Sequence, residues 1–173
     1  MLTIPVKKKG RYIQNINKVE IIDDGWRRKH WASIKLAYQK APYFELYSRE
    51  LEEFYNTKWT LLSDFNIQTT LYFIEKLNIK LNKILKGSEL NIGGNKTDLL
   101  MDICRKTNCD TYISGEGAKV YFEPHKFEDA GFAHLFVDNK NIKYNQLGND
   151  FINGIAIIEL LFMYGNEAGN MIQ

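Results

Sequence analysis

Apolar side chains recur at helical spacing through the first half of the chain and predict a helical segment at about 26–78. In the first expected helix, Trp31, Ile34 and Tyr38 lie on one face. Pro42 disfavours helical conformation at Ala41 and therefore ends that helix. The pattern divides the segment into three expected helices, over Trp26–Tyr38, Tyr43–Tyr55 and Thr60–Leu77.

The second half of the chain alternates between helical and β-prone runs. Helix, strand, turn, helix and strand in that order are typical of an α/β unit with parallel strands. The expected fold class is therefore α/β, with a small parallel or mixed sheet flanked by helices. Strands are expected at Leu2–Val6, Val19–Ile22, Lys83–Gly87, Thr111–Ile113 and Ala133–Val137, and helices at Lys96–Thr107 and Asp150–Tyr164.

Length, charge and cysteine content limit the classes of protein to which this chain can belong. A chain of 173 residues favours one domain over 1–173. The 23 basic and 21 acidic residues give no electrostatic footprint for nucleic acid or an anionic membrane. No apolar run reaches the roughly 18 residues of a membrane span, and the N-terminus lacks signal-peptide order. With two cysteines, Cys104 and Cys109, we expect a cytoplasmic protein with reduced thiols. His125 and His134 lack carboxylates at metal-ligand spacing, so no metal site is expected.

One segment, Asp110–Tyr121, is the best candidate for a ligand-binding loop. The β-prone run Thr111–Ile113 is expected to break at Ser114 and Gly115, and a second glycine follows at Gly117. A strand, a glycine turn and a helix start can turn backbone N–H groups toward a bound anion. The same residues are also common in ordinary turns, and local chemistry leaves both interpretations open.

His30 follows three basic residues within the first expected helix. The neighbouring cations disfavour a further positive charge, so the imidazole should be neutral near about pH 7. A neutral imidazole can act as a general base or as a hydrogen-bonding residue. The alternative is a partly buried helix residue with no chemical role.

Further polar groups cluster at a helix end and after a strand. Tyr38, Lys40 and Tyr43 flank the Ala-Pro corner, where they can donate to a carboxylate or phosphate or can simply solvate the helix end. Tyr144 and Gln146 follow a strand and loop, and either side chain can orient a ligand.

Taken together, these elements resemble the WbqC-like protein family in their order and spacing. The resemblance covers nearly the whole chain, and the Tyr-Ile-Ser-Gly turn matches most closely. The matching elements are Leu2–Val6, Trp26–His30, Tyr38–Phe44, Asn95–Thr97, Tyr112–Ala118 with Tyr121, Phe127, Gly131, Tyr144-x-Gln146, Phe151, and Leu160–Phe162 with Gly165.

The resemblance implies a role in O-antigen or other surface-polysaccharide biosynthesis, with transfer of glycine or another acyl group to a nucleotide-linked amino sugar. The expected partners are a sugar nucleotide or an activated acyl donor. His30 would be the base or a hydrogen-bonding residue, Lys40 would supply positive charge, and the backbone around Ser114, Gly115 and Gly117 would meet a phosphate or oxyanion. The substrate contacts would be Tyr38, Tyr43, Tyr121, Tyr144 and Gln146.

The chain also departs from the family pattern. Family members carry an N-terminal loop and strand before the position of Met1, so we expect a shortened WbqC-like domain. A missing strand would expose a sheet edge, which favours a homodimer. Met163 stands where the family has asparagine. A non-catalytic ligand-binding or scaffold module is the main alternative, and the lack of an Asp-x-Asp motif disfavours a glycosyltransferase.

Overall fold

The computed structural model describes residues 2–137, 142–148 and 150–172. Its internal contacts divide the chain into two compact units. Unit 1 comprises Met1–Lys80 and Asn141–Gln173, and unit 2 comprises Leu81–Lys140. The expectation of a single domain stays a prediction.

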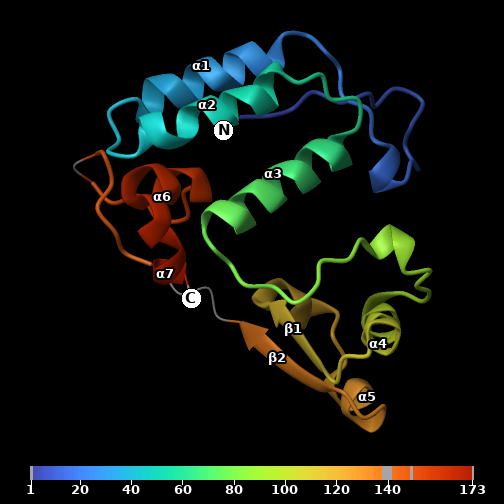
Figure 1. The fold of residues 1–173 in the computed structure, drawn as a ribbon. Helices are drawn as coiled ribbons and strands as arrows, with labels where there is room; N and C mark the ends of the chain where they lie inside the picture. Colours follow the sequence, from blue (N-terminus) through green and yellow to red (C-terminus); the bar gives the residue numbers. More distant parts are fainter. Residues whose placement is uncertain (1, 138–141, 149, 173) are drawn as a thin grey trace. The chain divides into compact units, whose positions relative to one another are not determined.

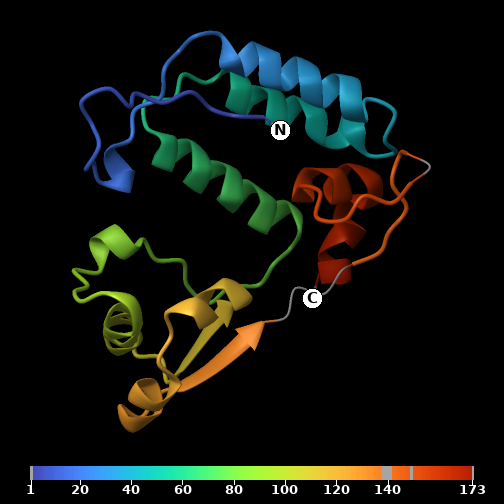
Figure 2. The ribbon, with the colours of Figure 1, turned by 180° about the vertical axis from the view of Figure 1, so that it is seen from behind.

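Unit 1 is helical, and its first two helices lie side by side in both views (Figures 1 and 2). The expected helix over Trp26–Tyr38 is confirmed with those bounds, and it begins after Gly25, where Asp24 accepts a hydrogen bond from the Trp26 amide. The elements of unit 1 are η1 (Ile16–Lys18), α1 (Trp26–Tyr38), α2 (Phe44–Asn56), α3 (Leu62–Lys76), α6 (Ile157–Tyr164), η4 (Gly165–Glu167) and α7 (Ala168–Ile172).

Aromatic rings form the core of unit 1. Trp31 stacks between Phe44 and Tyr55, with ring centroids 6.3 and 5.9 Å apart. Phe162 of α6 is fully buried and contacts both Tyr38 and Phe44. Such large rings bury most of the apolar area available to a small helical unit, and their contacts fix α6 against α1 and α2.

The N-terminal segment joins unit 1 through isolated bridges instead of full strands. Val6 pairs with Ile21, and Glu20 pairs with Leu61, both in antiparallel fashion. The strand expected at Leu2–Val6 is therefore one bridge position, Val6, and the strand expected at Val19–Ile22 is two, Glu20 and Ile21.

Unit 2 contains a two-stranded parallel sheet with helices, which confirms the expected α/β class. Figure 1 shows β1 and β2 side by side, and the register pairs Thr111 with Ala133 and Gly115 with Val137. The helix α4 and the strand β2 have the bounds expected from the sequence. The elements are η2 (Gly87–Glu89), α4 (Lys96–Thr107), β1 (Thr111–Gly115), η3 (Glu116–Val120), α5 (Pro124–Asp129) and β2 (Ala133–Val137).

Two sequence expectations differ from the structure. The strand expected at Lys83–Gly87 is wrong: these residues join no sheet ladder, and η2 begins at Gly87. The helix expected over Asp150–Tyr164 begins only at Ile157. Gly154 has a left-handed φ of 72°, which no α-helix can contain, so the helix starts after it.

Candidate functional site

The strand β1 runs two residues further than its β-prone side chains indicate. Ser114 and Gly115 continue the ladder opposite Phe136 and Val137. The expected break at Ser114 is therefore wrong, because pairing with β2 holds these small residues extended. Since both strands end together, Ser114 lies near the carboxyl end of a parallel sheet, where α/β proteins commonly bind ligands.

Ser114 is paired with a histidine of the neighbouring strand. Its Oγ lies 2.9 Å from Nε2 of His134, twenty residues further along the chain. Both side chains are half-buried and lie on the same face of the sheet. When Nε2 carries no proton, the hydroxyl donates to it, which is the arrangement of a nucleophile with its base.

Aromatic rings surround His134. Phe122 stacks on its imidazole at 3.8 Å between centroids, and Phe136 meets it edge-on at 4.2 Å. Burial among these rings lowers the pKa of His134 below its usual value of 6.5. The imidazole is therefore neutral near about pH 7 and is able to accept a proton.

The glycines that follow Ser114 are not required by the fold. Neither Gly115 nor Gly117 has a left-handed φ, and a Cβ built on either would meet no atom within 4 Å. The space beside the backbone there is open, which leaves room for a ligand to approach Ser114.

Tyr121 belongs to the same part of unit 2 and is 42% exposed at the end of η3. Buried Thr97 of α4 holds this stretch, since its hydroxyl bonds the Tyr121 carbonyl and accepts from the amide of Glu123. The Asn-Lys-Thr element of the sequence thus supports the segment after β1.

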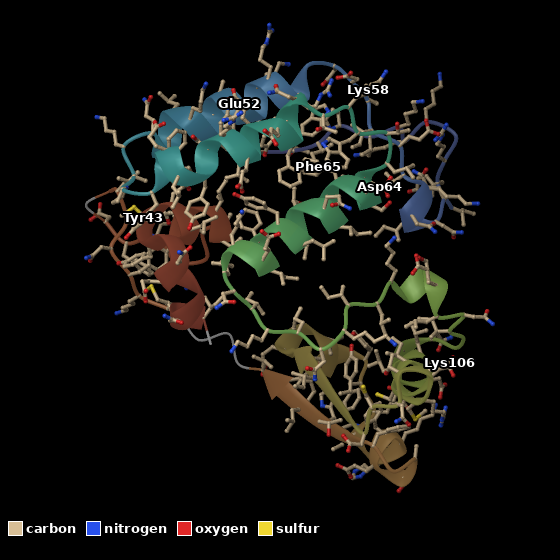
Figure 3. All side chains as sticks on the ribbon, in the orientation of Figure 1. Tyr43, Glu52, Lys58, Asp64, Phe65 and Lys106 are labelled. Carbon is tan, nitrogen blue, oxygen red and sulfur yellow. The ribbon has the colours of Figure 1, made fainter. Side chains whose placement is uncertain are left out.

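In unit 1, three of the expected site tyrosines gather around α6. The Tyr144 hydroxyl donates to Oε2 of Glu159 at 2.8 Å, and Glu159 is only 4% exposed. Burial, and secondly the charge of Glu159, raises the pKa of Tyr38. Tyr43 donates its amide to the Phe162 carbonyl, and its ring lies beside α6 (Figure 3).

Gly165 explains why Tyr43 can lie so close. Its φ of 57° with ψ of −131° is a conformation for glycine, and a Cβ there would lie 2.7 Å from the Tyr43 ring. The family-like Gly165 is therefore a packing residue as well as a helix terminator.

Lys40 and Gln146 have different surroundings. Lys40 is exposed in the turn between α1 and α2. Gln146 bonds both the amide and the carbonyl of Ile152, so its side chain closes the loop before α6. Its role as a substrate contact stays a prediction, and its observed role is to position that loop.

His30 lies in α1 at 7% exposure, and its Nε2 lies 3.0 Å from the Thr3 carbonyl. Since a carbonyl only accepts, Nε2 carries the proton, and the imidazole anchors the N-terminal segment. Lys40 lies ten positions on, roughly 15 Å further along a helical rise. His30 and Lys40 are thus not brought together.

The structure therefore assembles the expected residues into two groups, Tyr38, Tyr43 and Tyr144 in unit 1 and Ser114, Gly115, Gly117 and Tyr121 in unit 2. Sequence reasoning missed Glu159 and the role of His134. Glu159 could have been found as the one acidic residue within the apolar run that precedes Gly165. The β alternation that places His134 and Phe136 on one face was the signal for His134.

Two further searches concern metals and membranes. Within residues 2–137, 142–148 and 150–172, no three His, Cys, Asp or Glu side chains are grouped to hold a metal ion. None of the helices in this described part of the chain is long and apolar enough to cross a membrane.

Comparison with known proteins identifies the family to which the chain belongs. The model of the WbqC-like protein family matches residues 1–171. A relative, "Uncharacterized protein Rv1507c" of Mycobacterium tuberculosis, is 26% identical over 174 residues, covering 99% of this chain and 75% of the relative. No solved structure matches. On the strength of the family match, this chain belongs to the WbqC-like protein family.

Proposed function

We infer that the protein has a role in polysaccharide biosynthesis, the coarsest function that membership of the WbqC-like protein family supports. We propose that the protein is an acyltransferase that moves glycine or another acyl group from an activated donor to a nucleotide-linked amino sugar. The observation that supports this proposal is the hydrogen bond between Ser114 Oγ, near the carboxyl end of β1, and His134 Nε2, near the start of the neighbouring parallel strand β2.

In the first half-reaction, Ser114 Oγ attacks the carbonyl carbon of the donor, and its proton passes to His134 Nε2. The new bond joins Oγ to that carbon, and the bond from the carbon to the leaving group breaks. The leaving group departs with the proton from His134, and an acyl-serine remains.

In the second half-reaction, the amine of the amino sugar attacks the acyl-serine carbonyl. His134 takes a proton from the amine and returns it to Oγ as the acyl–oxygen bond breaks. The product is an amide, and Ser114 regains its hydroxyl. The open backbone at Gly115 and Gly117 is the proposed place for the oxyanion.

Of the other expected site residues, Tyr121 lies in the same unit as Ser114 and is a proposed substrate contact, to be tested by substitution. Unit 1 carries the remaining expectations, each still a prediction: substrate contacts at Tyr38, Tyr43, Tyr144 and Gln146, and catalytic roles for His30 and Lys40. A cytoplasmic location, with Cys104 and Cys109 as free thiols, is part of the proposal. So is a homodimer, which the exposed face of the two-stranded sheet supports.

A model ester tests the Ser114–His134 pair without knowledge of the natural donor. On reaction with p-nitrophenyl acetate, we expect p-nitrophenol release and one acetyl group on Ser114, located by peptide mapping. Ser114→Ala should lower the rate by about 100-fold or more, and His134→Gln should do likewise, because the nucleophile and its base are removed in turn. Ser88→Ala, in the same unit, is the matched control and should react like the native protein.

Acetylation elsewhere, or equal rates for Ser114→Ala and Ser88→Ala, would contradict the proposal. The natural reaction is then sought by incubating a glycyl thioester with a panel of nucleotide-linked amino sugars and detecting the amide by mass spectrometry. If none is acylated, and none raises the melting temperature, the non-catalytic scaffold interpretation replaces this one.

A further inference from the structure

A cleft lies between α1 and α2 in unit 1, and its lining includes none of the candidate site residues named above. Its volume of about 510 Å³ falls within the range of small-molecule sites. Figure 3 shows Glu52 on α2 where that helix runs beside α1. The lining residues are Asp23, Gly25, Arg27, Arg28, Trp31, Ala32, Lys35, Glu52, Tyr55 and Asn56.

One cation of the cleft is fixed by its neighbours. The Nη2 group of Arg27 donates to both carboxylate oxygens of Asp23, at 2.9 and 3.1 Å. Its Nη1 group donates to the Thr57 carbonyl at 2.6 Å. Asp23 therefore balances the charge of Arg27, and the two side chains form a rigid end wall.

The second carboxylate is also engaged. Glu52 accepts a hydrogen bond from the Trp31 indole, and its Oε1 lies 3.7 Å from Lys35 Nζ. Arg28 is exposed and forms no ion pair within the part of the chain that the structure describes. The positive charge of Arg28 is consequently not balanced by an ion pair with a described residue at the cleft.

The two outer cations flank a small residue. Arg28, Ala32 and Lys35 follow one another at helical spacing on α1, so the cations are separated by roughly 10 Å of helix rise. Ala32 leaves the space between them open. Burial raises the pKa of Tyr55 in the cleft lining, so its hydroxyl stays protonated and can donate.

From this arrangement, we propose that the cleft binds a phosphorylated small molecule, with a diphosphate held between Arg28 and Lys35. Flexible cationic side chains on both sides of an open floor suit two linked anionic groups. The guanidinium contributes paired N–H donors, and the ammonium contributes a point charge. This site does not depend on the proposed acyl transfer.

Isothermal titration calorimetry with inorganic pyrophosphate tests the site. Arg28→Glu should weaken binding by about tenfold or more, because it replaces a charge-assisted hydrogen bond by repulsion. Lys29→Glu makes the same charge change at an exposed neighbour that does not line the cleft, and should bind like the native protein. Ala32→Leu should fill the cleft and weaken binding, whereas Ala37→Leu on the same helix should not.

A gain of affinity gives a test that misfolding cannot imitate. Glu52→Gln should strengthen pyrophosphate binding, since it removes a negative charge and retains an acceptor for the Trp31 indole. Glu53→Gln, outside the cleft, is its control. No heat of binding to the native protein, or equal affinities for Arg28→Glu and Lys29→Glu, would overturn the proposal. The acetylation assay uses a probe without phosphate, so the two proposals fail separately.

Discussion

At the scale of single residues, the structure gives buried His30 and half-buried His134 different partners. His30 meets a backbone carbonyl, whereas His134 meets a serine hydroxyl. Both have lowered pKa values through burial. A neutral imidazole beside a hydroxyl can move a proton in a reaction, whereas one beside a carbonyl holds a segment in place. The hydrogen-bond partner is therefore the reason why His134 is proposed to be catalytic and His30 is given a structural role.

The burial of His30 predicts a pH-dependent stability. Burial lowers its pKa below 6.5, with the Thr3 hydrogen bond opposing the shift, so the unfolded chain takes up a proton that the folded chain resists. The contribution of neutral His30 to the free energy of unfolding is fully present above the pKa that this residue has in the unfolded chain. It is lost as the pH falls through the pKa that His30 has in the folded chain. The free energy of unfolding should therefore fall from about pH 7 to about pH 5, by at most about 1.4 kcal/mol per pH unit for one proton.

Urea unfolding of His30→Gln across this range measures the effect. Glutamine can still donate to Thr3 but does not titrate, so the slope should decrease, with His134 retaining a contribution of the same sign. Identical slopes for His30→Gln and the native protein would contradict the prediction.

At the scale of elements, the helix α4, which directly precedes β1 in the chain, supports the segment after β1. Thr97 lies in the first turn of α4 and is fully buried, and its hydroxyl bonds the Tyr121 carbonyl and the Glu123 amide. Because the hydroxyl both donates and accepts there, the loop position depends on this side chain. The helix α4 therefore positions the backbone that follows Ser114.

Thr97→Val keeps the shape and removes the hydroxyl. The Glu123 amide loses its partner, so the free energy of unfolding should fall by about 1–3 kcal/mol. Hydrogen exchange at that amide should accelerate, while Thr97→Ser should retain its protection. Thr107→Val alters a hydroxyl that bonds only within α4 and should leave the Glu123 amide unchanged. Unaltered exchange in Thr97→Val would show that the hydroxyl does not hold the loop.

At the scale of the whole molecule, the chain forms two compact units with different cores. The core of unit 1 comes mostly from helices, and that of unit 2 from α4, the sheet, Phe122 and Phe127 of α5. One face of the sheet is packed, while the other presents Ile113, Leu135 and Val137 at 59, 56 and 48% exposure. An apolar row on a sheet with unpaired edges favours association.

The exposed row predicts self-association through unit 2. Size-exclusion chromatography with light scattering should show a mass that rises from monomer to dimer with concentration. Leu135→Lys should keep the protein monomeric, because a charge would be buried at the interface. Leu36→Lys alters a leucine of α1 that is 79% exposed and should leave the dimer intact. A monomer at every concentration would contradict the prediction.

Elements whose residues carry a local pattern could be predicted from the amino-acid sequence alone. The helices α1 and α4 and the strand β2 follow directly from periodicity and from Pro42, and the ordered motifs identify the family. Local patterns also placed Ser114, Gly115 and Gly117 in one segment. They failed at the start of α6, since an apolar composition does not reveal the backbone conformation of Gly154.

Which side chains contact one another depends on the tertiary structure. The Ser114–His134 pair exists because β1 and β2 are parallel in one register, and a shift by one residue would turn His134 to the other face. The bond between Tyr144 and Glu159 likewise joins a loop to a helix, and the cleft between α1 and α2 needs both helices in place. Periodicity describes which face of an element is apolar, but contacts between elements depend on register and packing, which are properties of the folded chain.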